Sequence, residues 1–412
     1  MQPNKHHLIV DIEAYPEVTN AYKIIQRLNE AGHQAVLAGG AVRDLYLNKK
    51  PKDFDVATSA EPEEILKCFK RTQKVGIAFG VVLIHDFGIA TEVATFRKDG
   101  EYTDGRRPDN VIFTDAQNDA QRRDFSVNGM FYDFNEQTIL DYVDGLSDLK
   151  TKTIRAIRNP LERFEEDFLR MIRAIRFALV LNFEIENKTL EALKKCAHKI
   201  VEISPDRIHV ELKKCFNAMQ PNRAIKLLDT SKLLKFLFNN ANPGNYFLND
   251  HSYLSGGDFI ANLCLLNATE KSIQDLNQKL IDMRCTNDEK REVKNLFKFK
   301  DDLIKFSECE IYTQKRIIRK CETKRLLYLS LNLGASKENL KALEDKIQSW
   351  KKEDLYPDLM PTGNQLIKAG LKPNQNMGKY MEKLENDLLE GKINKREDVE
   401  THLKEYLSKN PN

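Results

Sequence analysis

The stretch Gly39–Thr58, GGAVRDLYLNKKPKDFDVAT, decides how this chain folds. The apolar run before it, Gln34–Gly40, predicts a strand, Ala41–Leu47 predicts a helix, and Asp53–Thr58 predicts a second strand. A glycine pair between a strand and a helix leaves backbone N–H groups free, and Gly40 is therefore a candidate phosphate ligand. Arg43, in the first helical turn, adds a charge-assisted contact.

Asp53 and Asp55 form a D-x-D pattern on the second of these strands. Alternate residues of a strand point to the same face, so the two carboxylates are expected to converge on one point. Hard oxygen ligands at this spacing suit Mg²⁺, which completes its shell with water and substrate phosphates. Glu92, on a neighbouring predicted strand, is a possible third carboxylate. The alternative is a turn at a strand edge with exposed aspartates.

Beyond this stretch the pattern divides the chain. Asn20–Gly32 and Glu61–Lys70 predict helices, and Gly80–Arg97 predicts a hairpin that turns around residues 86–88. From about Leu161 strand signals fade, and amphipathic segments with a 3.6-residue period continue to the end. The sequence therefore predicts an α+β protein with an α/β head and an all-helical remainder.

The composition sets wide bounds. A chain of 412 residues with 41% hydrophobic and 31% charged residues can bury two to four cores. The net charge of +3 implies no strongly basic surface, although a local basic stripe can still bind nucleic acid. Seven scattered cysteines and the absence of a long apolar run indicate a cytoplasmic protein without membrane segments.

Three motifs carry a resemblance. Gly39–Thr58 resembles the nucleotidyltransferase motif of the class II tRNA CCA-adding enzymes and bacterial poly(A) polymerases. Residues 101–113, EYTDGRRPDNVIF, resemble the flexible loop and ribose-side motif of that family. Ala120–Asp133, AQRRDFSVNGMFYD, is similar to its R-R-D-F-T-[IM]-N signature, with Ser126 in place of Thr and Gly129 in place of Ala. The resemblance implies that Arg123 contacts the nucleotide and that Asp124 and Asn128 shape the junction between head and neck.

The segment Arg163–Leu181 predicts one long helix on which Asp167, Arg170, Arg173 and Arg176 recur every third residue. Such a row is often a solvated surface of ion pairs. A sharper interpretation uses the shared edge of cytosine and adenine, which places an amino donor beside a ring-nitrogen acceptor. An Asp and an Arg complement that edge and reject uracil and guanine. The segment resembles the family's E-D-x-x-R motif, which gives Asp167 and Arg170 this role and places Arg173 and Arg176 in the nucleotide pocket.

The sequence motifs of the C-terminal half are less specific for one function. Residues 361–393 resemble the tail helices of bacterial CCA-adding enzymes, and the chain lacks the strongly basic extension usual in bacterial poly(A) polymerase. Lysines and arginines between Lys315 and Arg325 either contact tRNA phosphates or form a solvated surface. Nearer the neck, Ser204 and Pro205 are expected to open a structural helix as N-cap and N1.

The resemblance implies a division into head (1–150), neck (151–218), body (219–335) and tail (336–412). It also implies Mg²⁺-dependent addition of the 3′-terminal CCA to tRNA from CTP and ATP, with no obligate protein partner. The alternatives are a poly(A) polymerase, a relative that adds only A or only CC, and an inactive RNA-binding protein. Basic residues in Asp99–Pro108 argue against the CC-only relative, and the presence of both Asp53 and Asp55 argues against the inactive one.

Overall fold

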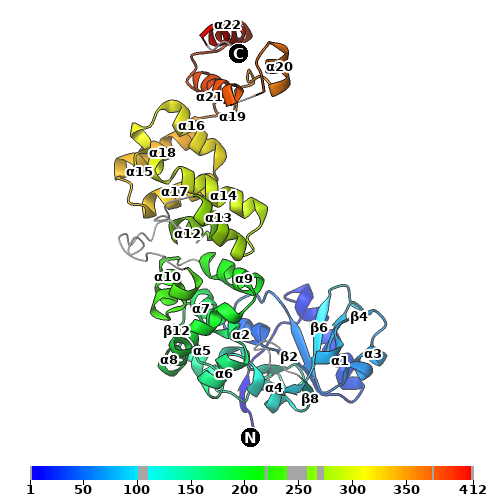
Figure 1. The fold of residues 1–412 in the computed structure, drawn as a ribbon. Helices are drawn as coiled ribbons and strands as arrows, with labels where there is room; N and C mark the ends of the chain where they lie inside the picture. The colour runs from blue at the N-terminus through cyan, green and yellow to red at the C-terminus, as the bar shows by residue number, and fades with distance from the viewer. Residues whose placement is uncertain are drawn as a thin grey trace. The chain divides into compact units, whose positions relative to one another are not determined.

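The computed structural model describes residues 2–100, 110–218, 221–238, 258–266, 273–373 and 375–409. The chain forms two compact units, Met1–Asn239 and Asn240–Asn412 (Figure 1). The first unit contains the sheet, and the second is helical throughout its described residues. Within the described ranges, none of the helices combines the length and the apolar character needed to span a membrane.

A mixed eight-stranded sheet forms the head, in the order β1-β10-β9-β2-β3-β6-β5-β4. Its strands are β1 Asn4–His7, β2 Ala35–Ala38, β3 Asp55–Thr58, β4 Thr72–Gly76, β5 Val81–Ile84, β6 Thr91–Thr95, β9 Phe131–Asp133 and β10 Thr138–Asp141. The predicted hairpin is the antiparallel pair β5–β6. A separate antiparallel pair, β7 Arg97–Asp99 with β8 Val111–Phe113, lies beside it in sequence.

The centre of this sheet is covered on both faces. All four residues of β2 are buried, as is typical of a strand between two layers. Helix α1 (Pro16–Glu30) contacts β2 and β3. A cluster contributed by the sheet, by α4 (Ala116–Arg122) and by the segments next to them lies in the core; its members are Val36, Ala38, Ala57, Phe96, Ala116, Ala120, Phe131 and Leu140. The turn after β2 is therefore held by rigid neighbours on both sides.

Short helices connect the strands of the head. They are α2 Gly40–Tyr46, α3 Pro62–Cys68, η1 Ile77–Phe79, α4 Ala116–Arg122, η2 Ser126–Asn128 and α5 Gly145–Lys150. The predicted helix over Glu61–Lys70 is α3, and Glu61 and Glu64 form a reciprocal capping box around its first turn. One boundary differs from the expectation. Strand β3 begins at Asp55 rather than at Asp53, so only one of the two acids lies within the strand.

The neck is helical apart from one short parallel pair, β11 Thr153–Ile154 with β12 Glu184–Ile185, which the sequence did not reveal. Its helices are α6 Pro160–Glu166, α7 Leu169–Leu181, α8 Asn187–Cys196, η3 Ala197–Glu202 and α9 Pro205–Phe216, and they are followed by α10 Pro221–Thr230 and α11 Leu233–Leu237. Helix α10 contacts α7, and α11 contacts η3, so residues 221–237 pack on the neck. The division into four parts remains a prediction.

The expectation of one continuous helix over Arg163–Leu181 was wrong. The helix breaks at Asp167, whose backbone is extended, with φ −152° and ψ 104°. The Asp167 carboxylate accepts a hydrogen bond from the Leu169 N–H at 3.0 Å, and its carbonyl accepts one from the Arg170 N–H at 3.0 Å. Asp competes well with the helical backbone in this way. Because of this break, α7 begins at Leu169, and Asp167 lies just before its N-terminal end.

The second unit consists of α12 Phe259–Leu266, α13 Ile273–Asp282, α14 Asn287–Lys298, α15 Lys300–Ile304, η5 Phe306–Glu308, α16 Ile311–Lys320, α17 Thr323–Asn332, α18 Lys337–Ser349, α19 Lys352–Leu355, α20 Gly363–Lys368, α21 Gln375–Leu389 and α22 Arg396–Lys409. The last three helices and the loops next to them share an apolar core of Leu366, Leu371, Tyr380, Leu384, Leu388, Ile393, Val399 and Leu403.

The arginines of the basic helix α16 have an internal role. Arg316 and Arg319 both donate to the Glu385 carboxylate of α21 at 2.5 Å, and each guanidinium is only 14% exposed. Arg325, on α17, pairs with Asp258 and Glu292. Neither interpretation of the charge run foresaw this. These arginines bind carboxylates within the second unit, and three of them are therefore committed to holding its helices together.

Replacing Glu385 by Gln should loosen α21. Burial alone would raise the pKa of Glu385, but hydrogen bonds and charge from Arg319 and Arg316 lower it below its usual value. The stabilisation is therefore complete above pH ~4.5 and is lost as the pH falls through the lowered pKa. We expect Glu385→Gln to speed amide hydrogen exchange in α21 about 5- to 100-fold at pH 7, equivalent to about 1–3 kcal/mol.

Glu382→Gln is the matched control, because Glu382 is 68% exposed and lies 3.7 Å from Arg316. It should leave exchange in α21 nearly unchanged. Equal exchange in Glu385→Gln and the parent protein would contradict the assignment of a stabilising clamp.

Candidate active site

One cleft of about 1050 Å³ contains all of the predicted site residues. The head contributes the glycine turn and the acids, and the neck contributes a row of arginines. These residues are Gly40, Arg43, Asp53, Asp55, Arg123, Asp167, Arg170, Arg173 and Arg176. Lys49, Lys50 and Lys52, from the connection between α2 and β3, also line the cleft. Asp53 and Asp55 thus lie in a cleft that is otherwise lined mainly by lysines and arginines.

The acids converge although Asp53 precedes the strand. Phe54 is buried, and the two aspartates on either side of it are exposed at the cleft. Strand β3 runs parallel to β6 with Val56 opposite Val93, which places Glu92 beside Asp55 on the same side of the sheet. Loss of hydration in the cleft, followed by the charge of Glu92, raises the pKa of Asp55 to about 6, with Arg123 opposing and Asp53 adding to the effect. Three carboxylates therefore crowd one point.

The glycine turn depends on Gly39 more than on Gly40. Gly39 has φ +69° and ψ −124°, a conformation that L side chains rarely adopt. A Cβ on Gly39 would lie 2.8 Å from Nη1 of Arg123, so the guanidinium lies directly against this glycine. Gly40 opens α2, and a Cβ there would be in ordinary contact with Arg43, 3.5 Å from Nη2. The absence of a side chain at Gly39 thus lets Arg123 reach the turn.

Arg43 is buried and held by its neighbours. Its Nε donates to Asp44 at 2.8 Å and its Nη1 donates to the side-chain oxygen of Asn128 at 2.5 Å. Its guanidinium also lies over the Phe177 ring of the neck, 5.4 Å from the centroid. Arg43 therefore presents a fixed positive charge at the cleft.

Asp124 joins the head to the neck. Its Oδ2 accepts from Nε of Arg173 at 2.9 Å and from Nη2 of the same guanidinium. Its Oδ1 accepts from the Asn128 side chain at 3.1 Å and from the Phe125 N–H at 2.8 Å. Burial alone would raise the pKa of Asp124, but the charge and hydrogen bonds of Arg173, together with Asn128, lower it to about 2. The expectation that Asp124 and Asn128 shape this junction agrees with the geometry.

Ion pairs also hold the other residues of the neck row. Asp167 accepts from Arg207 at 2.7 Å, Arg170 pairs with Glu166 at 2.5 Å, and Arg176 pairs with Glu211 at 3.0 Å. Glu166 and Arg170 have the i, i+4 spacing of an ion pair. The row lines the cleft and is ion-paired at the same time, and its role in reading a base remains a prediction.

Sequence reasoning missed several residues that position the cleft. Arg207 and Glu211 lie on α9, which the pattern indicated only as a structural helix; Ser204 is its N-cap residue but makes no side-chain capping bond. Asp119, buried in α4, binds Arg122 and Arg123. Arg207 and Glu211 are spaced i, i+4 on α9, which signals a shared helix face. Their partners, however, lie about 35–40 residues away in the chain. The predicted loop motif at 101–109 lies outside the described residues.

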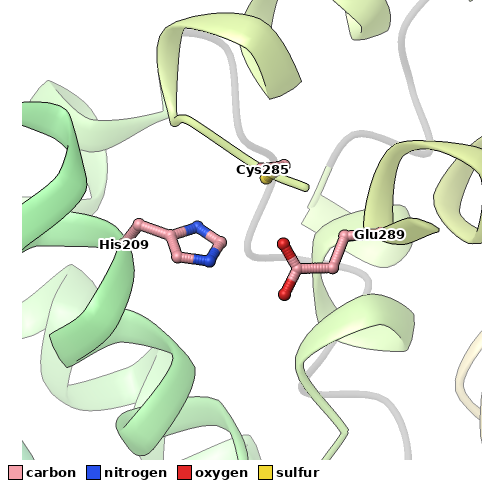
Figure 2. A group of neighbouring side chains, drawn as sticks. All are labelled: His209, Cys285 and Glu289. Atoms are coloured by element: carbon pink, nitrogen blue, oxygen red, sulfur yellow. The ribbon is translucent and has the colours of Figure 1, made fainter. Parts of the chain in front are cut away.

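The Glu289 side chain of the second unit has a role within its own helix. Figure 2 shows Cys285 and Glu289 at the start of α14. Glu289 Oε2 accepts from the Thr286 N–H at 2.8 Å, and Thr286 Oγ1 accepts from the Glu289 N–H at 3.2 Å. These two hydrogen bonds form a reciprocal capping box, in which the Glu289 carboxylate caps the N-terminus of α14. His209, also drawn there, belongs to α9 of the first unit.

Comparison with known proteins shows the family to which the chain belongs. Two family models match it: the poly(A) polymerase head domain over residues 35–155, and the probable RNA- and SrmB-binding site of polymerase A over residues 182–244. The CCA-adding enzyme of Ligilactobacillus salivarius is 32% identical over 402 residues, covering 92% of this chain and 93% of the relative. The chain belongs to the CCA-adding enzyme family. A nucleotidyltransferase of this family generally uses a divalent metal.

Two further relatives refine this placement. The CCA-adding enzyme of Pediococcus pentosaceus is 44% identical over 221 residues, which span 53% of this chain and only 56% of that relative. The structure of the Bacillus stearothermophilus CCA-adding enzyme in complex with CTP matches 96% of this chain and 98% of its own, with a TM-score of 0.74 at 24% identity. That likeness shows the CCA-adding enzyme fold, as predicted for the head and the helical remainder.

The two glycines of the turn should respond differently to alanine. Gly39→Ala forces an L residue to φ +69° and a Cβ into the Arg123 guanidinium, so we expect a loss of about 1–3 kcal/mol in the free energy of unfolding of the first unit. Gly40→Ala meets only ordinary contacts and should change it by less than about 1 kcal/mol. Thermal melting of both variants, measured side by side, checks this. Equal melting temperatures would contradict the assignment of strain to Gly39.

Proposed function

We propose that this protein adds the 3′-terminal cytidine, cytidine and adenosine of tRNA from CTP and ATP, without a nucleic-acid template. The observation that carries the proposal is the single cleft in which the acids of the head meet the arginines of the neck. Membership of the CCA-adding enzyme family supports it. We also propose the cytoplasm as its location, where tRNA, CTP and ATP are available.

The proposed reaction is one displacement at phosphorus. The 3′-hydroxyl oxygen of the RNA bonds to the α-phosphorus of the nucleotide, and the bond from that phosphorus to the oxygen bridging the α- and β-phosphates breaks. The hydroxyl proton goes to solvent, and pyrophosphate leaves. Catalysis of this class rests on positioning and on charge stabilisation rather than on covalent chemistry with the protein. Gly40 and Arg43 are proposed to hold the triphosphate, with Arg123 beside it.

Asp53 and Asp55 are proposed to hold Mg²⁺. The donor set fits, because hard carboxylate oxygens are the ligands that Mg²⁺ prefers. Loss of hydration and then the charge of Glu92 raise the pKa of Asp55, and the charge contribution is a further argument, since a cation between these groups would relieve the repulsion. When bound, Mg²⁺ supplies positive charge to the phosphate oxygens. Glu92 stands beside Asp55 and adds to the negative charge that would hold the ion.

Asp167 and Arg170 are proposed to read the base. An ionised carboxylate accepts about four hydrogen bonds, so Asp167 can accept from a base amino group while it keeps its bonds to Arg207 and Leu169. Arg170 would donate to the adjacent ring nitrogen. Glu166 and Arg207 would keep both groups oriented, and uracil or guanine would meet donors with donors and acceptors with acceptors. Arg173 and Arg176 would complete the pocket.

Ordered addition of nucleotides tests this proposal. A tRNA transcript that lacks its CCA end is incubated with CTP alone, then with ATP alone, and the products are separated on a sequencing gel. We expect two added residues with CTP, one more after ATP is supplied, and termination there. Asp55→Asn should give no product while retaining tRNA binding in a gel-shift assay, because the proposed ligand of Mg²⁺ is lost.

The alternatives give different products. Long products from ATP alone would identify a poly(A) polymerase. Addition of one A only to transcripts that already end in CC would identify an A-adding relative, and addition of two C residues without A would identify a CC-adding one. Binding without any addition would leave an RNA-binding protein. Each of these outcomes would overturn the proposal.

A further inference from the structure

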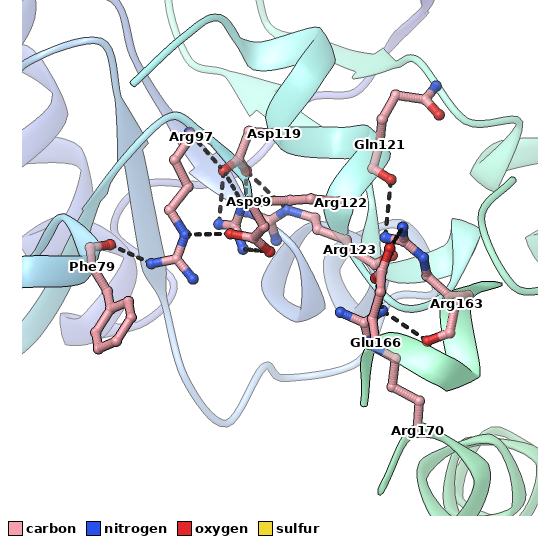
Figure 3. A network of polar contacts seen from close by, with 10 residues as sticks. All are labelled: Phe79, Arg97, Asp99, Asp119, Gln121, Arg122, Arg123, Arg163, Glu166 and Arg170. Carbon is pink, nitrogen blue, oxygen red and sulfur yellow. Dashed lines mark hydrogen bonds and ion pairs between the residues drawn. The ribbon is translucent and has the colours of Figure 1, made fainter. Parts of the chain in front are cut away.

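Asp119 is a buried acid that neither the motifs nor the proposed reaction uses. It lies on α4 and is 1% exposed. Its Oδ1 accepts from Arg122, 2.8 Å from Nε and 2.7 Å from Nη2, and from the Arg97 backbone N–H at 3.3 Å. Its Oδ2 accepts from Nε and Nη2 of Arg123 at 3.1 and 3.0 Å. One carboxylate thus holds two consecutive arginines (Figure 3).

The bond to Arg123 sets the direction of that guanidinium. Arg123 follows α4 with an extended backbone and lies over the Phe131 ring, 5.0 Å from the centroid. Because Asp119 engages Nε and Nη2, Nη1 remains for the opposite side. There it lies 3.4 Å from the Asn128 carbonyl and against Gly39. The charge of Arg123 reaches Asp55 from this position.

The bond to Arg122, which also lines the cleft, connects α4 with β7. Arg122 also lies 3.9 Å from Asp99, which accepts from Nε of Arg97 at 3.1 Å. Arg97 in turn donates to the Phe79 carbonyl. Figure 3 shows this chain of contacts running from Phe79 through β7 to α4. The two oxygens of Asp119 therefore serve two limbs, one to the glycine turn and one to β7.

We infer that Asp119 is a positioning residue for nucleotide transfer, which acts by aiming Arg123 at the phosphate side of the bound nucleotide. The inference rests on the proposed function and adds a residue to it. A purely structural role, in which Asp119 only fastens α4 to β7, is the competing explanation. The two differ in whether the effect of Asp119 on catalysis passes through Arg123.

Two substitutions to asparagine distinguish the contacts of Asp119 with Arg123 from those with β7. Asp119→Asn has one acceptor oxygen and one NH₂ donor, so it can keep Arg122 or Arg123 but not both, and it leaves two guanidinium groups without their shared negative charge. Asp99→Asn is the matched control, because it weakens the limb toward β7 and leaves the bond from Asp119 to Arg123 in place. Both variants should melt at lower temperature than the parent protein.

The decisive experiment is a double-mutant cycle with Arg123→Gln, measured as kcat/KM for CTP and ATP with tRNA saturating. We expect Asp119→Asn to lower kcat/KM about 10- to 100-fold in the parent protein and by less than about twofold in the Arg123→Gln background. KM for tRNA should stay unchanged, and any effect of Asp99→Asn on kcat/KM should be the same with and without Arg123→Gln. Losses from Asp119→Asn that multiply independently, or a loss from Asp99→Asn that also disappears in the Arg123→Gln background, would overturn the role of Asp119.

A second variant keeps the test decisive where Asp119→Asn is too unstable to assay. Asp119→Glu retains the charge but moves the oxygens by one methylene, so it should lower kcat/KM for nucleotides with the same dependence on Arg123. The activity of the parent protein distinguishes a failure of the proposed function from a failure of the role of Asp119. If it adds no nucleotides, the proposed function fails, whereas an active enzyme with independent losses overturns only the role of Asp119.

Discussion

The ion pair between Asp124 and Arg173 fixes the two walls of the cleft relative to each other. Asp124 follows the arginine pair of the head motif, and Arg173 lies in the middle of α7 in the neck. The carboxylate is 8% exposed and its pKa is lowered to about 2, so the pair is ionised at any physiological pH. Removing one partner of such a pair leaves an uncompensated charge, which costs several kcal/mol. This contact therefore helps to hold the glycine turn, the acids and the arginine row around one cleft.

A pattern of carboxylates holding arginines recurs around the cleft. Asp119 holds Arg123, Glu166 holds Arg170, and Glu211 holds Arg176. A guanidinium has five donors in a rigid fork, so one edge can be fixed by the protein while another faces a ligand. Fixing the arginines in advance lowers the ordering cost of binding a triphosphate. The same carboxylates offset the mutual repulsion of arginines spaced three residues apart.

Much of this arrangement was predictable from sequence, for identifiable reasons. The order strand–glycines–helix–acids is local, and the structure places Gly40, Arg43, Asp53 and Asp55 in one cleft as that order implies. The break at Asp167 was not predicted, because the apolar period continues through it, and a side chain that bonds its own backbone leaves no mark on the period. Strands β1 and β12 were missed because they are short and acquire their partners only through tertiary contacts. Arg207 and Glu211 pair across long sequence separations, which a single sequence cannot reveal.

The proposed function requires that head and neck together bind one nucleotide. Isothermal titration of CTP into the protein with Mg²⁺ and without RNA measures this directly. Asp124→Asn, checked by circular dichroism to be folded, should bind CTP at least ~10-fold more weakly than the parent. The exposed control Asp206→Asn, at the start of α9, should bind it normally. Undiminished CTP binding by folded Asp124→Asn would contradict the claim.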